Sequence, residues 1–264
     1  MLAVATVLAG AVLAPAQLLA RHAPVVVLHP QERFVPTRVE PFLAAAEDEG
    51  RRLEITGCDA MLGPAAEPCY EQLQAAPTAY GRVLKTRRRI VVQYWLFYPY
   101  NMWPSQGIWR SHEGDWEHVT LVLDAKGRPL EAGYSAHCAG HRRPWARVPR
   151  RGARPLVYVG LGSHANYFAP GSHRHALRCW PEAARIVFRA RKVVPVDLAA
   201  AGRTVRPAVA RPGTWLSYRG AWGGDGWFWI EGIDPLRFGL GPVGPAFQSD
   251  WRDPLRELAR WPVG

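Results

Sequence analysis

Lysine is nearly absent from this chain of 264 residues, since only Lys85, Lys126 and Lys192 occur among its 33 basic residues. Arginine therefore carries almost all of the formal charge of +11, which remains after 22 acidic residues are counted. A cationic surface favours anionic partners such as phospholipid head groups or cell-wall polymers, although net charge bears on association and not on fold. A composition rich in arginine, alanine and proline is also typical of proteins from GC-rich genomes, so the charge need not mark a dedicated site.

The sequence also lacks an apolar run of the ~20 residues that a membrane-spanning helix needs. The N-terminal run, residues 2–14 (LAVATVLAGAVLA), is shorter and leads into Ala-Pro-Ala, small residues of the kind that signal peptidase recognises. Residues 1–20 are therefore predicted to be a signal peptide, with a retained N-terminal anchor as the alternative. On this interpretation the protein is secreted or attached to the cell envelope.

Cysteine is scarce, and no two cysteines have the CxxC spacing of a structural zinc site. An even number of four suits an oxidising compartment. Cys58 and Cys69 flank a short loop that contains glycine and proline, so we predict that they pair, and that Cys138 then pairs with Cys179. Four unbridged buried thiols are the alternative.

Glycine and proline are abundant, at 25 and 24 residues, which indicates many turns and few long helices. Runs of β-branched and aromatic residues between turn signals predict strands, and two segments predict short helices. The fold class is therefore mainly β, a single-domain antiparallel β-sandwich over residues 24–262 with a few short peripheral helices. The predicted strands are residues 24–30, 87–101, 116–124 and 130–137, the predicted helices are 37–50 and 252–261, and the arginine-rich segment 141–155 is predicted to be an exposed loop.

Acidic residues gather in the stretch SHEGDWEHVTLVLD, residues 111–124, directly before an apolar alternation. In a strand Asp115 and Glu117 share a face, and His112 precedes them closely enough to fold over it. Two neighbouring carboxylates repel each other unless a cation or a proton lies between them. Oxygen ligands favour Ca²⁺, Mg²⁺ or Mn²⁺ over Zn²⁺, whereas a histidine ligand favours Mn²⁺ or Zn²⁺. The alternative is that both carboxylates accept hydrogen bonds and His112 is an ordinary loop residue.

Two further histidines stand at predicted strand ends, His137 in YSAH and His164 in GLGSHANY. Together with His112 they could meet at one rim of a sandwich. Ser163 beside His164 does not form a nucleophile elbow, because adjacent residues of an extended chain point apart. The arginine-rich segment has only Trp145 interleaved, too few aromatic residues for stacking on single-stranded nucleic acid, and no nucleic-acid partner is expected.

Several motifs resemble, in their order, the vacuolar protein sorting-associated protein 62 family. They are PVVVLHPQERFVPTRVEPFL, QYWLFYPYN, GDWEHVTLVL, YSAH, RPLVYVGLGSHANYF and YRGAWG followed by GPVGPAFQSDW. The resemblance extends over residues 24–254, and it implies no established reaction.

The stretch is also distantly similar to the heptapeptide GHRHDWE of the necrosis-inducing, Nep-like secreted proteins. That resemblance implies a β-sandwich with a metal at one rim that helps to engage membrane glycolipids. It places His112, Asp115 and Glu117 on the first His, the Asp and the Glu of the heptapeptide, and Asn101 where an earlier Asp stands. His164 corresponds to the His of a later GxxKHA-like segment.

Three hypotheses follow for this rim. The first is an exported binding module that holds a divalent cation through Asn101, His112, Asp115 and Glu117 and recognises an anionic lipid or glycan surface. The second is a metal-dependent hydrolase in which His137 or His164 acts as general base. The third is a structural surface protein without a metal.

Overall fold

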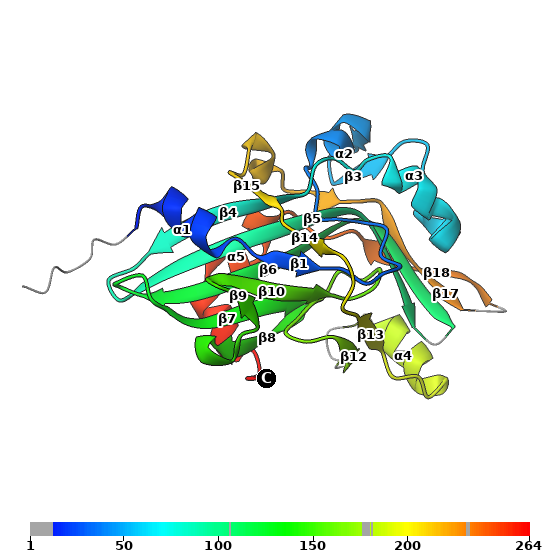
Figure 1. Ribbon diagram of the computed structural model, residues 1–264. Coiled ribbons are helices and arrows are strands. Elements are labelled where there is room, and N and C mark those ends of the chain that lie inside the picture. Colours follow the sequence, from blue (N-terminus) through cyan, green and yellow to red (C-terminus); the bar gives the residue numbers. More distant parts are fainter. Residues whose placement is uncertain (1–12, 106, 176–179, 181, 231–232) are drawn as a thin grey trace, which may run out of the picture.

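The computed structural model describes residues 13–105, 107–175, 180, 182–230 and 233–264. Strands dominate it and the helices are short, which confirms a mainly β, single-domain fold (Figure 1). The helices are α1 (Pro15–His22), α2 (Glu40–Ala45), α3 (Glu67–Glu71), α4 (Glu182–Ala190), α5 (Ser249–Arg252) and α6 (Pro254–Arg260), with 3-10 segments at η1 (Ala60–Ala66), η2 (Trp145–Arg147), η4 (Thr214–Ser217) and η5 (Pro245–Phe247). The strands are β1 (Val25–Val27), β2 (Ala46–Asp48), β3 (Arg52–Ile55), β4 (Thr78–Lys85), β5 (Arg89–Ser105), β6 (Ile108–Asp124), β7 (Pro129–Ala136), β8 (Ala139–Pro144), β9 (Arg150–Arg151), β10 (Arg154–Val159), β11 (Asn166–Tyr167), β12 (Gly171–Arg174), β13 (Val196–Ala199), β14 (Thr204–Val205), β15 (Ala208–Ala210), β16 (Ala221–Trp222), β17 (Asp225–Ile230) and β18 (Ile233–Leu240).

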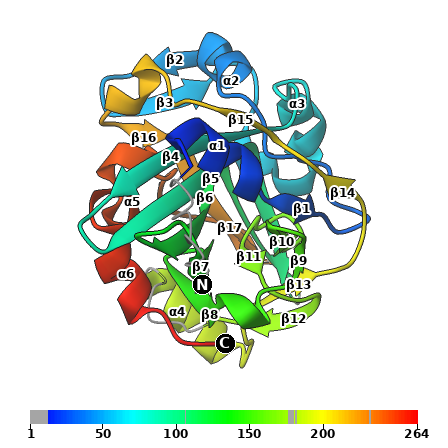
Figure 2. The same cartoon turned by 60° about the vertical axis from the view of Figure 1, so that its left-hand side comes forward.

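The central sheet is built around a long antiparallel pair, β5 and β6, of 17 residues each. Their β-branched and aromatic residues favour extended backbone, which is why the predicted strand at residues 87–101 forms. The strand order is β15-β4-β5-β6-β17-β18, and β7 pairs with β6 and with β8. Segments around α2 and α3 lie on one side of this sheet and α4 with β12 on the other, in both Figure 1 and Figure 2.

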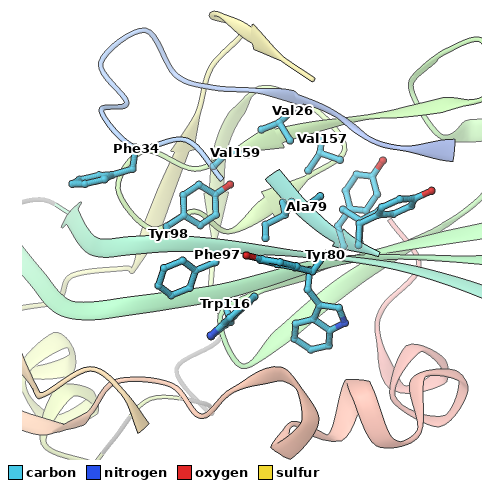
Figure 3. Close-up of a cluster of buried hydrophobic side chains, with 14 of the residues drawn as sticks. Val26, Phe34, Ala79, Tyr80, Phe97, Tyr98, Trp116, Val157 and Val159 are labelled. Atoms are coloured by element: carbon cyan, nitrogen blue, oxygen red, sulfur yellow. The ribbon is translucent and has the colours of Figure 1, made fainter. Parts of the chain in front are cut away.

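A second sheet, ordered β11-β10-β1-β14, packs against one face of the central sheet. Val26 and Val159 are fully buried and lie on the side toward which Tyr98 projects (Figure 3). Phe97, the chain neighbour of Tyr98, projects to the opposite side, beside Trp116 (Figure 3), so both faces of β5 are covered. Most strand pairs are antiparallel as predicted, but β1 with β10, β15 with β4, and β16 with β3 are parallel.

Other local predictions have mixed outcomes. The disulfide between Cys58 and Cys69 is confirmed. Cys179 lies outside the described residues, so its predicted pairing with Cys138 is not tested. The terminal helix is confirmed as α6, with the Asp253 side chain accepting from the backbone N of Arg256 at 3.2 Å. Within the described residues no helix is long and apolar enough to span a bilayer.

The prediction of an exposed loop at residues 141–155 is wrong. These residues form β8, η2, β9 and the start of β10, because β8 pairs with β7 and β9 pairs with β10. Arg142 ends in an ion pair with Glu131 at 3.3 Å, and Arg150 donates to backbone carbonyls. Many of the arginines of this segment therefore lie on strands, and their abundance does not indicate irregular structure.

Candidate functional site

The candidate site lies at a gap in the central sheet. On one side β6 is paired with β5 along its whole length, but on the other side β17 reaches only residues 108–111 and β7 only residues 119–123. Residues 112–118 thus run between two neighbouring strands that do not meet. A cavity of about 310 Å³ opens at this point, and its lining includes Asn101, His112, Asp115, Glu117 and His137.

Gly114 shapes the backbone at the gap. Its φ is +56°, a conformation that favours glycine, and a Cβ atom built there would lie 1.9 Å from the carbonyl oxygen of Trp222. Glycine alone fits, and the turn that it makes directs the Gly114 carbonyl back toward His112.

His112 is held in one tautomer by this backbone. Its Nδ1 lies 2.8 Å from the Gly114 oxygen and 3.1 Å from the Glu113 oxygen, and since carbonyls only accept, Nδ1 carries the proton. Burial lowers the pKa of His112 to about 4 despite the nearby charge of Asp115, so the ring is neutral at neutral pH. Its Nε2 keeps a lone pair that no described residue engages, which is the state that a metal ligand requires.

Asp115 is anchored through one oxygen. Its Oδ2 accepts from Asn101 Nδ2 at 3.0 Å and from His164 Nδ1 at 3.0 Å, while the Asn101 amide also donates to the Ser163 oxygen at 3.2 Å. Burial by itself would raise the pKa of Asp115, but the hydrogen bond and the charge of His164, together with His112 and Asn101, outweigh it and lower that pKa. Asp115 is therefore a carboxylate, and its Oδ1 has no partner in the described part of the chain.

His164 lies behind Asp115 and does not line the cavity. Its ring stacks on Tyr98 with centroids 3.8 Å apart, and its Nε2 is 3.7 Å from Glu32 Oε1. Burial disfavours the imidazolium, yet the hydrogen bond to Asp115 and the negative charges of Asp115 and Glu32 together prevail and raise the pKa of His164 to about 9. A ring that stays protonated at neutral pH orients Asp115 and cannot accept a proton, so His137 is better placed for a general-base role.

Glu117 is the second carboxyl group of the cavity. It accepts the Ser135 hydroxyl and, at 3.1 Å, the backbone N–H of His137. Burial and the negative charge of Asp115 raise the pKa of Glu117 well above its usual range. Two buried carboxyl groups that lie close together oppose each other's ionisation, and a cation bound between them removes this repulsion.

Glu113, the remaining acid of the motif, has a structural role. Its carboxylate accepts from the Tyr70 hydroxyl at 2.7 Å and from the Gly224 backbone at 2.8 Å, and it is absent from the cavity lining. It fixes β6 to the segment between β16 and β17.

A second cluster adjoins the cavity through His137. His137 Nε2 lies 3.1 Å from Asp197 Oδ2, and His175 Nε2 lies 2.8 Å from the same oxygen. The Tyr167 hydroxyl donates to this oxygen at 2.5 Å. No sequence pattern predicts this cluster, because His175 and Asp197 stand 22 positions apart in no recognisable motif. The antiparallel pairing of β12 with β13 places His175 beside Asp197, and the fold brings both to His137.

Comparison with known proteins adds relatives but no activity. No protein-family model matches the chain. It is 26% identical over 248 residues to vacuolar protein sorting-associated protein 62 of Saccharomyces cerevisiae, in a match that covers 78% of this chain and 50% of the yeast protein. A second yeast protein assigned by name to vacuolar protein sorting, TDA6, is 33% identical over 31% of this chain and 22% of its own length. The chain thus spans about half or less of the curated relatives that it matches.

Among solved structures the similar ones include a toxin fold for microbial attack and plant defense, with a TM-score of 0.49, 15% identity, and coverage of 92% of this chain and 89% of the other. NLPPya in complex with mannosamine has a TM-score of 0.48 and 17% identity at the same coverage. The curated relatives and the similar solved structures thus correspond to the two groups of proteins that the motifs resemble.

Proposed function

We propose that the protein binds a divalent cation in the gap of the central sheet through Asn101, His112, Asp115 and Glu117. The observation that carries the proposal is the locked tautomer of His112, whose Nε2 lone pair lines the same cavity as two buried carboxyl groups. An imidazole nitrogen, an amide oxygen and carboxylate oxygens form a set that suits Mn²⁺, Mg²⁺ or Ca²⁺.

The residues present fit such an ion. Asn101 and His164 donate only to Oδ2 of Asp115, so Oδ1 is a candidate ligand. The Asn101 amide nitrogen donates to Asp115 and to the Ser163 oxygen, and the Asn101 carbonyl oxygen is therefore a candidate ligand as well. A bound cation would supply charge compensation for the two acids and a Lewis-acidic contact for a ligand oxygen. The ring of His164, in turn, keeps Asp115 oriented.

The remaining cavity wall suits an anionic ligand with hydroxyl groups. The guanidinium carbon of Arg110 lies 4.3 Å from the Phe238 ring and 5.1 Å from the Trp180 ring, and Arg110 forms no ion pair with any described residue. Burial lowers the pKa of Arg110 to about 10, which leaves it cationic at neutral pH. An unpaired arginine matches a phosphate or carboxylate, whereas a tryptophan face and a cation match a sugar or inositol ring. We therefore infer a cell-surface lipid head group or glycan that carries an acidic group.

Export belongs to the same proposal. The disulfide between Cys58 and Cys69 is of the kind that persists in oxidising compartments, which supports a secreted or envelope-associated protein.

Metal content tests the cation site. Chelator-treated protein would be titrated with Ca²⁺, Mg²⁺ and Mn²⁺ by calorimetry, and the loaded protein analysed by elemental mass spectrometry. We expect one ion per chain in the wild type and its loss in folded Asp115→Asn and Glu117→Gln, with Glu131→Gln, a half-buried position of β7 outside the cavity lining, as matched control. Unchanged ion content in both folded variants would refute the assignment.

Ligand binding is tested separately. Vesicles of phosphatidylcholine with and without phosphatidylinositol, and an oligogalacturonide, would serve as the lipid and glycan probes. We expect binding to one of them that falls on chelation and in Arg110→Gln, but not in the exposed control Arg189→Gln. Binding equal in Arg110→Gln and the wild type would contradict the anionic-ligand inference while leaving the cation site standing.

A metal-dependent hydrolase is the second candidate. The observation in its favour is that His137 lines the cavity and is oriented by the buried Asp197. Turnover of a phosphoester or glycoside substrate that is lost in both Asp115→Asn and His137→Gln would establish it.

A further inference from the structure

His137, His175 and Asp197 place three metal-ligating atoms together in a part of the molecule that the proposed cation site does not use. The atoms Nε2, Nε2 and Oδ2 all lie within 4.8 Å of one another. They come from three segments: the turn after β7, the residue after β12, and β13. Asp197 is completely buried, and both histidine side chains are nearly so.

The hydrogen bonds of Asp197 are distributed unevenly between its two oxygens. Three groups converge on Oδ2, namely the two imidazoles and the Tyr167 hydroxyl, whereas the buried Oδ1 has no partner in the described part of the chain. A carboxylate held only by hydrogen bonds gains by sharing donors between its oxygens, since an unsatisfied buried acceptor is costly. Two imidazole nitrogens and one carboxylate oxygen within 4.8 Å of one another are instead an arrangement that one metal ion can bridge.

The backbone of His137 is consistent with a fixed ligand. Its φ is +58°, a conformation that is uncommon for residues other than glycine, although histidine adopts it more often than most. Strain of this kind persists where the surrounding structure demands a particular side-chain direction. Here the conformation brings the backbone N–H to Glu117 and the ring to Asp197.

The separations suit zinc. Zinc bonds of ~2.0–2.1 Å in tetrahedral geometry place ligand atoms about 3.3 Å apart. The observed distances from Asp197 Oδ2 are 3.1 Å to His137 and 2.8 Å to His175, so a small adjustment of the rings admits the ion. Two imidazoles and one carboxylate form a ligand set typical of Zn²⁺ with one position left for water.

We propose that His137, His175 and Asp197 form a zinc site, distinct from the oxygen-rich cation site at Asp115. The ion ties the antiparallel pair of β12 and β13 to the turn between β7 and β8. His137 then serves as a ligand through Nε2, so a zinc ion bound here and the hydrolase candidate with His137 as general base are alternatives. Since His137 also lines the cavity, the zinc lies next to the proposed binding site.

Zinc titration of chelator-treated protein tests the site, with Co²⁺ as a spectroscopic probe because tetrahedral Co²⁺ shows intense visible absorption. We expect one Zn²⁺ per chain, and an affinity at least ~100-fold lower in His175→Gln and Asp197→Asn. His175→Gln keeps the proposal testable if Asp197→Asn fails to fold.

Two variants serve as controls. His173 stands two positions from His175, but its ring stacks on Tyr167 with centroids 3.8 Å apart and its Nε2 bonds the Ala169 oxygen. Since His173 is not one of the three proposed ligands, His173→Gln should bind zinc as the wild type does. Asp115→Asn should also keep its zinc, even if it loses Ca²⁺, Mg²⁺ or Mn²⁺. Full zinc affinity in folded His175→Gln, loss of zinc in Asp115→Asn, or no stoichiometric zinc in the wild type would each overturn the proposal.

Discussion

His164 and Asp115 form a buried ion pair in which Nδ1 and Oδ2 are 3.0 Å apart and the imidazole is fully enclosed. Two constraints meet in this histidine: its charge is required by Asp115 and Glu32, and its φ of +55° lies in the left-handed region. The pair therefore orients the carboxylate of the proposed cation site from behind.

Removing the charge of His164 should destabilise the fold. Leaving a buried carboxylate without its partner costs about 3–5 kcal/mol, so we expect His164→Asn to lower the free energy of unfolding by about 3 kcal/mol in urea denaturation. Asparagine tolerates positive φ, so the loss reports on the side chain, its charge and its stacking on Tyr98, and not on backbone conformation. His173→Asn, at a half-buried histidine without a carboxylate contact, is the control. A loss for His164→Asn no larger than for the control would show that the pair contributes little.

Gly114 provides a test of the backbone at the gap. Gly114→Ala combines an unfavourable φ with a clash against the Trp222 oxygen, and we expect a loss of several kcal/mol or failure to fold. Gly107 has a φ of +78° but nothing within 4 Å of a Cβ, so Gly107→Ala measures the conformational cost alone, about 1 kcal/mol. Thermal unfolding of both variants separates the two effects. Equal losses would mean that the strand yields at Gly114 without cost.

His22 should make stability depend on pH. Its Nδ1 donates to the Ala153 oxygen at 2.9 Å and its buried Nε2 has no partner in the described residues. Burial, with help from the charge of Arg21, lowers its pKa below the usual 6.5. Above that value His22 is neutral in both states and adds no pH dependence. As the pH falls below it, the unfolded chain takes up a proton that the folded chain refuses, so stability declines.

The variant His22→Asn keeps a donor for Ala153 and removes the titration. Free energies of unfolding measured between about pH 8 and about pH 5.5 should decline less steeply in His22→Asn than in the wild type. Identical slopes would show that His22 is protonated equally in both states.

The period-two alternation of strands was enough to predict that Asp115 and Glu117 share a face, and both line one cavity. Local signals also predict the Cys58–Cys69 disulfide and the start of α6 at Pro254. These features depend on residues close together in the chain, where geometry and pairing are governed by short-range rules.

Features that depend on distant partners could not be predicted. Thr37 and Glu40 have the spacing of a capping box, yet the helix begins at Glu40, with Pro41 in its first turn, because the Thr37 hydroxyl is engaged by the backbone N of Ala75 at 2.7 Å. His112 stands outside the predicted strand at residues 116–124, but it lies in β6, which continues through the positive φ of Gly114. The Nε2 lone pair of His112 is free because the Gly114 carbonyl accepts the proton on Nδ1, and the direction of that carbonyl depends on the folded backbone.

The packing of α1 yields a final prediction. Leu18 is completely buried in the main core, and the Tyr94 hydroxyl donates to the Leu19 oxygen at 2.8 Å. We expect Leu18→Ala to lower the free energy of unfolding by about 3 kcal/mol, because it opens a cavity, whereas Gln17→Ala on the exposed face should change it by less than about 0.5 kcal/mol.

Because α1 begins within the predicted signal peptide of residues 1–20 and ends beyond it at His22, this packing bears on where export processing cuts the chain. Cleavage after Ala16 keeps Leu18 and Leu19, whereas cleavage after Ala20 removes both. We expect the intact mass of the exported protein to retain Leu18. A mature chain that begins after Ala20 and is as stable as one that begins at Gln17 would show that the contacts of α1 do not stabilise the domain.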